Sequence, residues 1–185
     1  MVDSLNSARR IKPAPAGRRQ QDGQCKRRES GGSEMTYEVD QSNKIESSGD
    51  TVLAMSNGVT YTVRIPAREK RLAFEELRTQ FERLSRKYIY LRLFSASLYF
   101  LLLKLPSNEL VVIDVEYHGH ESHIKSLLLS WLRKTRPDIE PDQITFGLVG
   151  KKSRAHDAAI AVYRKEVRAD RTIKADDLLN QIIGQ

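Results

Sequence analysis

The sequence contains one cysteine, Cys25, among 185 residues. A single thiol excludes a disulfide framework and a four-cysteine zinc site, and it suits a reducing compartment, so we expect a cytoplasmic protein. Aromatic residues make up only 7% of the chain. Because no strand-like segment interleaves aromatic with basic residues, the sequence predicts no stacking platform for single-stranded nucleic acid.

Long hydrophobic runs are also missing. The most apolar stretch, Leu93–Leu103, is bounded by Arg92 and Lys104, and it is far shorter than the roughly 20 residues that cross a bilayer. The N-terminal residues carry charge with no apolar region after it, which argues against a secretory signal peptide. We therefore expect no membrane partner and interpret Leu93–Leu103 as part of a buried helix.

Positive charge is in excess. The chain has 31 Lys and Arg against 24 Asp and Glu, which gives a formal net charge of +7. Most of this excess falls after residue 50, where 22 basic residues face 16 acidic ones. Basic surfaces commonly bind polyanions, so we expect nucleic acid as the partner, with DNA and RNA equally open.

The composition changes near residue 50. Residues 1–50 are rich in Gly, Ser, Gln, Pro and charge, a composition that buries too little apolar surface to offset the entropy of ordering the chain. The sequence therefore predicts a disordered basic and polar tail over residues 1–50 and a folded domain over residues 51–185.

From residue 51 the pattern predicts an α/β domain. Two β-branched runs around Asn57-Gly58 indicate a hairpin, and the later strands alternate with helices, which predicts parallel pairing with right-handed crossovers. Leu110–Val115 is almost continuously apolar, as expected of a central strand buried on both faces. We expect strands at Thr51–Met55, Val59–Ile65, Tyr88–Leu93, Leu110–Val115 and Ile144–Val149, and helices at Ala67–Lys87, Ser95–Leu105, Glu121–Lys134, Ser153–Lys165 and Ala175–Ile183.

Two acidic residues end the Leu110–Val115 region. Asp114 and Glu116 are two apart, so they share one face of the strand, and Asp114 lies in an apolar run where a lone charge is costly. Ligands of open α/β sheets bind beyond the carboxyl ends of the strands. The pair is therefore a candidate metal or catalytic site, or else one acid caps the next helix and the other faces solvent.

Three histidines follow directly, at His118, His120 and His123. Imidazole and carboxylate together suit zinc or manganese, although the spacing matches no established zinc signature. The alternative is a turn at Gly119 with histidines on its surface.

The segment after Val149 combines a flexible turn at Gly150 with Lys151, Lys152 and Ser153. Ser153 is a good N-cap, and a helix N-terminus flanked by cations is a natural phosphate site. The alternative is that the lysines are only solvated.

The same helix begins with His156 and Asp157. Both are expected to face the end of the sheet that carries Asp114, a convergence typical of functional sites. Acidic residues are also common in a first helical turn because they complement the helix dipole.

These motifs together resemble the RNase H-like fold, and within it the RuvC-type resolvase branch. VLAMSNGVTYTV is similar to the opening strand and turn, LVVIDVEY to the second acidic strand, and AHDAAIAV to the closing helix. The resemblance covers residues 51–165. It implies a mixed sheet, with an opening β-hairpin followed by parallel strands, flanked by helices.

The resemblance also implies a nuclease or resolvase that hydrolyses phosphodiesters with two Mg²⁺ or Mn²⁺ ions about 3.5–4 Å apart, acting as a homodimer. Carried over to this sequence, it implies three sets of residues. The catalytic residues would be Asp114, Glu116 and Asp157; the metal ligands Asp114, Asp157 and His156; and the nucleic-acid contacts Lys151, Lys152 and Arg154.

Three features depart from the family pattern. The position of its opening aspartate holds Ser56, or Met55 if the register shifts, and the third strand of its opening meander is not evident. An extra strand–helix segment, residues 88–105, also lies between the first helix and the acidic strand. The alternative function is therefore a catalytically degenerate RNase H-like domain that binds nucleic acid or acts as a scaffold.

Overall fold

The computed structural model describes residues 36–184, so Cys25 and most of the predicted basic tail lie outside the described residues. Within that range no helix is both long enough and apolar enough to cross a membrane. The described chain is an α/β fold, as expected, with six strands in one mixed sheet and five α-helices around it.

The sheet has the strand order β5-β4-β1-β2-β3-β6. The first three strands form an antiparallel meander, while β4 and β5 run parallel to β1 on one side and β6 runs parallel to β3 on the other. The predicted hairpin and the predicted parallel pairing are confirmed. The strands are β1 (Thr36–Ser42), β2 (Thr51–Ser56), β3 (Thr60–Ile65), β4 (Leu110–Asp114), β5 (Ile144–Gly147) and β6 (Arg171–Thr172).

Strand β1 corrects the predicted domain boundary. Tyr37 and Val39 of this strand enter the core, and the strand pairs with β2 on one side and β4 on the other. Disorder through residue 50 is therefore wrong for residues 36–50. Two apolar side chains are enough to hold this short strand in the sheet, because they alternate with polar ones and so lie on one buried face.

The helices are α1 (Ala67–Gln80), α2 (Arg86–Leu102), α3 (Glu121–Thr135), α4 (Arg154–Tyr163) and α5 (Ala175–Ile183), with a short 3-10 turn at Pro141–Gln143. The predicted strand at Tyr88–Leu93 is wrong, because these residues form the first part of α2. Twelve of the 17 residues of α2 are buried. A helix that is apolar on all sides lacks the periodicity that separates helix from strand.

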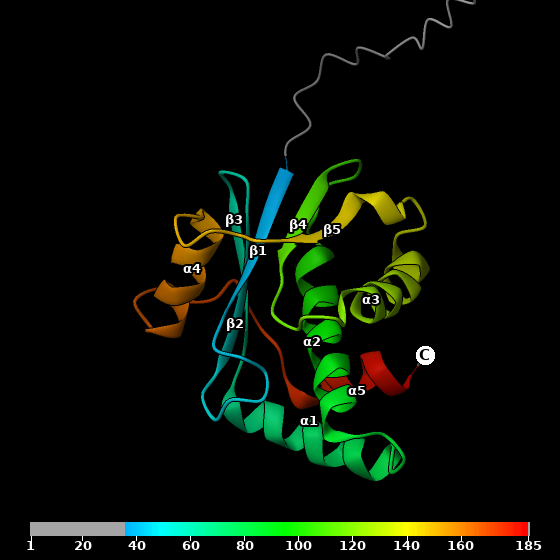
Figure 1. The fold of residues 1–185 in the computed structure, drawn as a ribbon. Helices are drawn as coiled ribbons and strands as arrows, with labels where there is room; N and C mark the ends of the chain where they lie inside the picture. Colours follow the sequence, from blue (N-terminus) through cyan, green and yellow to red (C-terminus); the bar gives the residue numbers. More distant parts are fainter. Residues whose placement is uncertain (1–35, 185) are drawn as a thin grey trace, which may run out of the picture. The chain divides into compact units, whose positions relative to one another are not determined.

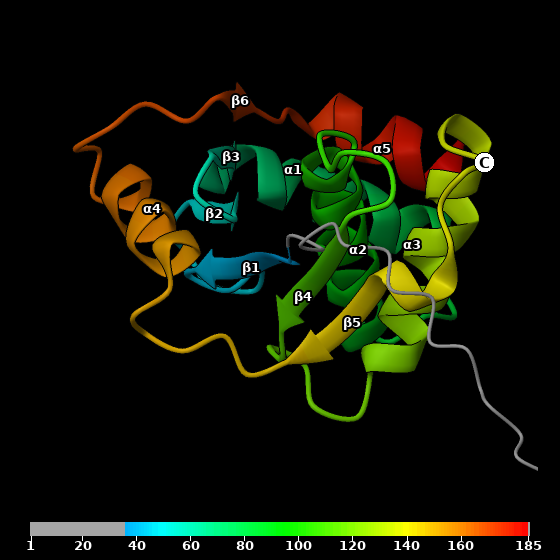
Figure 2. The ribbon, with the colours of Figure 1, turned by 90° about the horizontal axis from the view of Figure 1, so that it is seen from above.

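The two faces of the sheet are covered differently (Figures 1 and 2). Helices α1, α2, α3 and α5 share one face and enclose the main core. Helix α4 lies alone on the other face, over β1, β2 and β3. It packs there on a small cluster formed by Val52, Ala54, Ala155, Ala159 and Val162.

Strand β2, rather than β4, is the strand that is buried on both faces. Every residue of β2 is buried, because helices cover both of its faces. In β4 only Val111 and Ile113 are buried and the other three residues are partly exposed, since α4 does not extend over this strand (Figure 2). The expectation that Leu110–Val115 is buried on both faces is therefore wrong, and Asp114 lies on the less covered face.

Candidate functional site

Three carboxylates meet where β1 and β4 run side by side. The parallel register pairs Val39 with Ile113, so the next residues, Asp40 and Asp114, lie on neighbouring strands with their side chains on the same face. Glu116 follows two residues later. One carboxylate oxygen from each of Asp40, Asp114 and Glu116 lies within 4.8 Å of the other two.

Helix α4 contributes an imidazole to this acidic cluster (Asp40, Asp114 and Glu116). Nδ1 of His156 forms a hydrogen bond with Oδ2 of Asp40, and the side chain of Asp40 is only 7% exposed. Oδ1 of Asp40 accepts a hydrogen bond from the Gln41 N–H at 2.6 Å. The buried carboxylate is thus held by one backbone and one side-chain partner, as a buried charge requires.

Ala155 and Ala159 bring α4 close to the sheet. Both are fully buried against Val52 and Ala54 of β2, and four small or β-branched side chains let the helix backbone approach the strands closely. His156 lies between the two alanines in sequence. The short side chains of α4 therefore explain how an imidazole on a helix reaches a carboxylate in the sheet.

Asp114 is held by the segment that leads from β5 to α4. Its Oδ1 accepts a hydrogen bond from the Val149 N–H at 2.8 Å. In the register of the sheet Asp114 is paired with Gly147 of β5, which has no side chain to cover the carboxylate. The Val149 N–H therefore orients one oxygen of Asp114.

The pKa of the Glu116 carboxyl is raised above its ordinary value. Burial raises its pKa, and the negative charges of Asp114 and Asp40 raise it further, while the Lys44 ammonium opposes them. Lys44 Nζ lies 3.6 Å from Oε2 of Glu116 and donates to its backbone carbonyl at 3.3 Å. Because burial is the largest cause of the raised pKa and the two acids add to it, a further positive charge near Glu116 would favour its ionised form.

Lys70 of α1 holds the β1–β2 loop, which carries Lys44. Lys70 is 4% exposed, and its ammonium donates to the Lys44 and Ser47 carbonyls and to Thr51 Oγ1, at 3.3, 2.9 and 2.8 Å. Burial lowers the pKa of Lys70 to about 8. This buried ammonium sets the shape of the loop and hence the position of Lys44.

Among the predicted catalytic and metal-binding residues, Asp114 and Glu116 converge in the acidic cluster, and His156 reaches it through its hydrogen bond to Asp40. Asp157 is exposed and is not part of the acidic cluster. Neighbouring residues of a helix point about 100° apart, so when His156 faces the sheet the next side chain turns away from it. The structure thus separates the two residues that the sequence analysis placed in one site.

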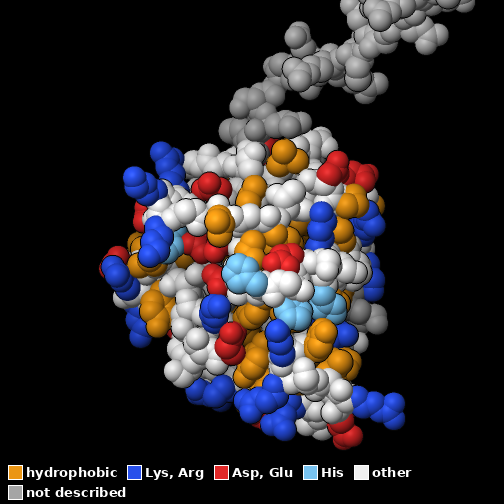
Figure 3. All heavy atoms as spheres, viewed as in Figure 1, with side chains coloured by type: hydrophobic (Ala, Val, Ile, Leu, Met, Phe, Trp, Pro, Cys, Tyr) orange, Lys and Arg blue, Asp and Glu red, His pale blue; other side chains and the backbone are white. Residues whose placement is uncertain are grey.

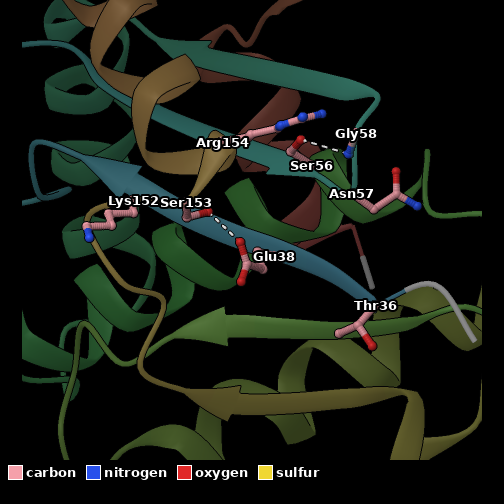
Figure 4. A pocket seen from close by; sticks show the side chains of 8 residues that line it. All are labelled: Thr36, Glu38, Ser56, Asn57, Gly58, Lys152, Ser153 and Arg154. Atoms are coloured by element: carbon pink, nitrogen blue, oxygen red, sulfur yellow. Dashed lines mark hydrogen bonds between the residues drawn. The ribbon is translucent and has the colours of Figure 1, made fainter.

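Two of the three predicted phosphate contacts, Lys152 and Arg154, line a cavity of about 410 Å³ at the start of α4 (Figure 4). Ser153 caps the helix, as predicted, by accepting from the Ala155 N–H at 3.1 Å. Its hydroxyl donates to Oε2 of Glu38 at 2.6 Å, so a carboxylate already lies at this helix N-terminus. The expected phosphate at this position is therefore disfavoured by charge, and Lys151, Lys152 and Arg154 remain as exposed cations beside it.

The three histidines after β4 do not form a metal-ligand set with the acids. Of the described residues, the acidic cluster is the only group of three or more potential ligands that converges. His120 and His123 instead pack edge-to-face on Tyr88, with ring centroids 6.0 and 5.4 Å apart. Gly119 makes the predicted turn, with φ at 78°.

Asp40, Glu38 and Lys44 escaped the sequence analysis because they lie before residue 51. The alternation of Tyr37 and Val39 with polar residues in TYEVDQS was the available signal. It is only seven residues long and follows a strongly polar stretch, so the average composition of the first 50 residues concealed it.

Comparison of the chain with protein-family models, with curated proteins and with solved structures found no match.

Proposed function

We propose that the protein hydrolyses phosphodiester bonds in nucleic acid, with a divalent cation held by Asp40, Asp114 and Glu116. The observation that carries the proposal is the convergence of these carboxylates from β1 and from the end of β4, within 4.8 Å of one another. Three acids in so small a space repel one another, and a divalent cation is the ligand that best relieves the repulsion.

The donor set fits Mg²⁺ or Mn²⁺. Both ions prefer oxygen ligands, and each carboxylate of the cluster is oriented by a separate protein contact, from Gln41, Val149 or Lys44. A cation bound there would stabilise charge on the phosphate and lower the pKa of water.

The protein's own side chains have separable roles in this proposal. His156 holds Asp40 through Nδ1, so its Nε2 is the atom that can exchange a proton with the solvent or with the reacting groups. At 27% exposure the imidazole is accessible. Lys44 limits the negative charge of the cluster through its ion pair with Glu116.

The strand order supports the resemblance to the RNase H-like fold. Strands β1, β2 and β3 form an antiparallel meander, whose third strand was not evident from the sequence. The first of these strands is β1 and carries Asp40, so Ser56 on β2 no longer stands for the opening aspartate. On this proposal Asp40 is the opening acid, Asp114 and Glu116 the second acidic strand, and His156 the contribution of the closing helix.

A cleavage assay with the full chain and Mn²⁺ tests the proposal. Asp114→Asn keeps the size and the hydrogen-bonding oxygen of the side chain but removes its charge, so we expect cleavage to fall by at least about a hundredfold. The matched control is Asp142→Asn, an exposed acid at the opposite end of β5, which should cleave like the wild type. Undiminished cleavage by Asp114→Asn would refute the site.

A second function, nucleic-acid binding without catalysis, is favoured by one observation. Lys44 already neutralises part of the acidic cluster from within the chain, and exposed cations lie beside α4. In that case the chain binds nucleic acid without Mn²⁺-dependent cleavage. Replacing Lys151 and Lys152 by Ala should then reduce the log–log dependence of binding on salt by roughly one unit per lost phosphate contact.

A further inference from the structure

A compact cluster of rings lies near the acidic cluster along the chain and is not used by the proposed reaction. Tyr88, near the start of α2, contacts His120 and His123, at the start of α3. Both imidazoles are nearly perpendicular to the tyrosine ring, at 85° and 89°, with centroid distances of 6.0 and 5.4 Å. Residues from two separate helices thus make one aromatic surface, which no single segment of the sequence indicates.

Tyr88 is held in place and yet open to solvent. Its side chain is 42% exposed, although two edge-to-face contacts fix its orientation. An exposed ring that is already ordered loses little conformational entropy when a ligand packs on it, which favours tight binding. Isolated exposed aromatic residues are common, but a ring that two others support is better suited to binding.

The His123 imidazole that packs on Tyr88 is uncharged at neutral pH. Burial lowers its pKa, and the nearby charges of Arg92 and His120 lower it further. Its Nε2 is out of contact with solvent and has no hydrogen-bond partner within residues 36–184. The imidazole therefore acts as a packed ring that supports Tyr88 rather than as a cation that pairs with phosphate.

The ring cluster is close to the acidic cluster along the chain. His120 is four positions after Glu116, which limits the distance between their Cα atoms to about 14 Å. Between them, Tyr117 packs on Phe94 of α2, with ring centroids 5.0 Å apart. Figure 3 shows histidine side chains beside acidic ones on the same face of the molecule.

We propose that Tyr88, supported by His120 and His123, stacks on an unpaired base of a nucleic acid. The inference rests on the proposed function and specifies its substrate class as single-stranded or locally unpaired nucleic acid. Bases stack readily on tyrosine and histidine rings once they are free of a duplex, whereas a paired base is already stacked within its helix. A strand whose phosphate lies at the acidic cluster can place a nearby base on Tyr88.

The experiment measures base stacking without catalysis. The full chain is titrated, in EDTA, into oligonucleotides that carry the fluorescent base 2-aminopurine, either single-stranded or in a duplex of the same sequence. Stacking on the ring is expected to quench the fluorescence of the single strand. Tyr88→Ala should weaken single-strand binding by about tenfold or more and abolish the quenching, while it leaves duplex binding unchanged.

Two further variants control for the ring and for its location. Tyr88→Phe keeps the ring and should bind like the wild type, and it remains a test if Tyr88→Ala fails to fold. Tyr163→Ala removes a tyrosine of almost the same exposure, 41%, from the far end of α4, and it should change neither binding nor quenching.

The outcomes separate this inference from the proposed reaction. If Tyr88→Ala binds single strands as tightly as the wild type, or loses single-strand and duplex binding equally, the stacking site is refuted even where cleavage is observed. If single strands are bound and quenched through Tyr88 but Mn²⁺ gives no cleavage, the stacking site stands and the nuclease is refuted. A chain that binds no nucleic acid refutes both.

Discussion

The two faces of the sheet differ in the size of the side chains that they bury. On one face, four helices bury large side chains such as Phe94, Leu98 and Leu101 almost completely. On the other, a single helix buries only a small cluster of Ala and Val side chains, and the polar residues around it include the acidic cluster. Stability therefore depends mostly on the first face, because burial of apolar area scales with side-chain size.

On the second face, a small buried cluster is enough to position the candidate site. Helix α4 has to be held just firmly enough, through Ala155 and Ala159, to keep His156 on Asp40. The open part of the same face, over β4 and β5, leaves Asp114 accessible. The comparison predicts that substitutions on the two faces have separable effects on folding and on chemistry.

The largest expected effect is a loss of stability on the first face. Leu98→Ala removes a fully buried side chain of α2 and should lower the free energy of unfolding by about 2–5 kcal/mol. Urea denaturation measures the loss, and the cleavage rate per folded molecule should not change. If Leu98→Ala still unfolds cooperatively but cleaves more slowly per folded molecule, the two faces are coupled.

The next effect comes from overpacking the second face. Ala159→Leu places a larger side chain between α4 and β2, which should cost about 1–3 kcal/mol of stability and move His156 away from Asp40. Its control, Ala96→Leu, overpacks the fully buried Ala96 on the first face. Both variants should lose similar stability in thermal melts, but only Ala159→Leu should lose Mn²⁺-dependent cleavage.

A pH effect follows from the raised pKa of Glu116. Burial and the neighbouring acids favour its protonated form, so protons compete with a cation at a higher pH than for an ordinary glutamate. Below that raised pKa, the affinity for Mn²⁺ should fall about tenfold per pH unit, because binding then releases one proton. Calorimetric titrations between pH 4 and 7 measure this slope. Glu116→Gln should flatten it, and an unchanged slope in that variant would exclude Glu116 as the cause.

The smallest effect is a gain in stability at the end of α4. Lys165 follows the helix with φ at 64°, a left-handed conformation that favours glycine. Lys165→Gly should raise the free energy of unfolding by about 0.5–1 kcal/mol without altering cleavage. Lys165→Ala retains the strain and should give no gain in the same denaturation experiment.

Much of the fold was accessible from the sequence where a pattern is long and periodic. The hairpin around Asn57-Gly58 and the helices at Glu121–Thr135 and Ala175–Ile183 follow from turn chemistry and amphipathic spacing. The strand predicted at Tyr88–Leu93 failed because α2 is apolar on all sides, so its residues carry no helical period. Local pattern determines such a segment only when one of its faces is solvated.

The site was less accessible because it depends on pairing between distant strands. Asp114 stood out as a charge within an apolar run, but Asp40 acquires its meaning only when β1 pairs with β4, about 70 residues later in the chain. Likewise, the sequence analysis placed Asp157 among both the catalytic residues and the metal ligands, and His156 only among the metal ligands. Only the orientation of α4 on β1 and β2 selects the imidazole.

The central claim, that Asp40 belongs to a cation site and Asp157 does not, is tested most directly by a Mn²⁺ titration of three full-length chains. Calorimetry on the wild type, Asp40→Asn and Asp157→Asn compares two conservative changes that each remove one negative charge. We expect the wild type and Asp157→Asn to bind with equal affinity, and Asp40→Asn to bind at least about tenfold more weakly. Equal binding by Asp40→Asn, or a loss confined to Asp157→Asn, would contradict the account.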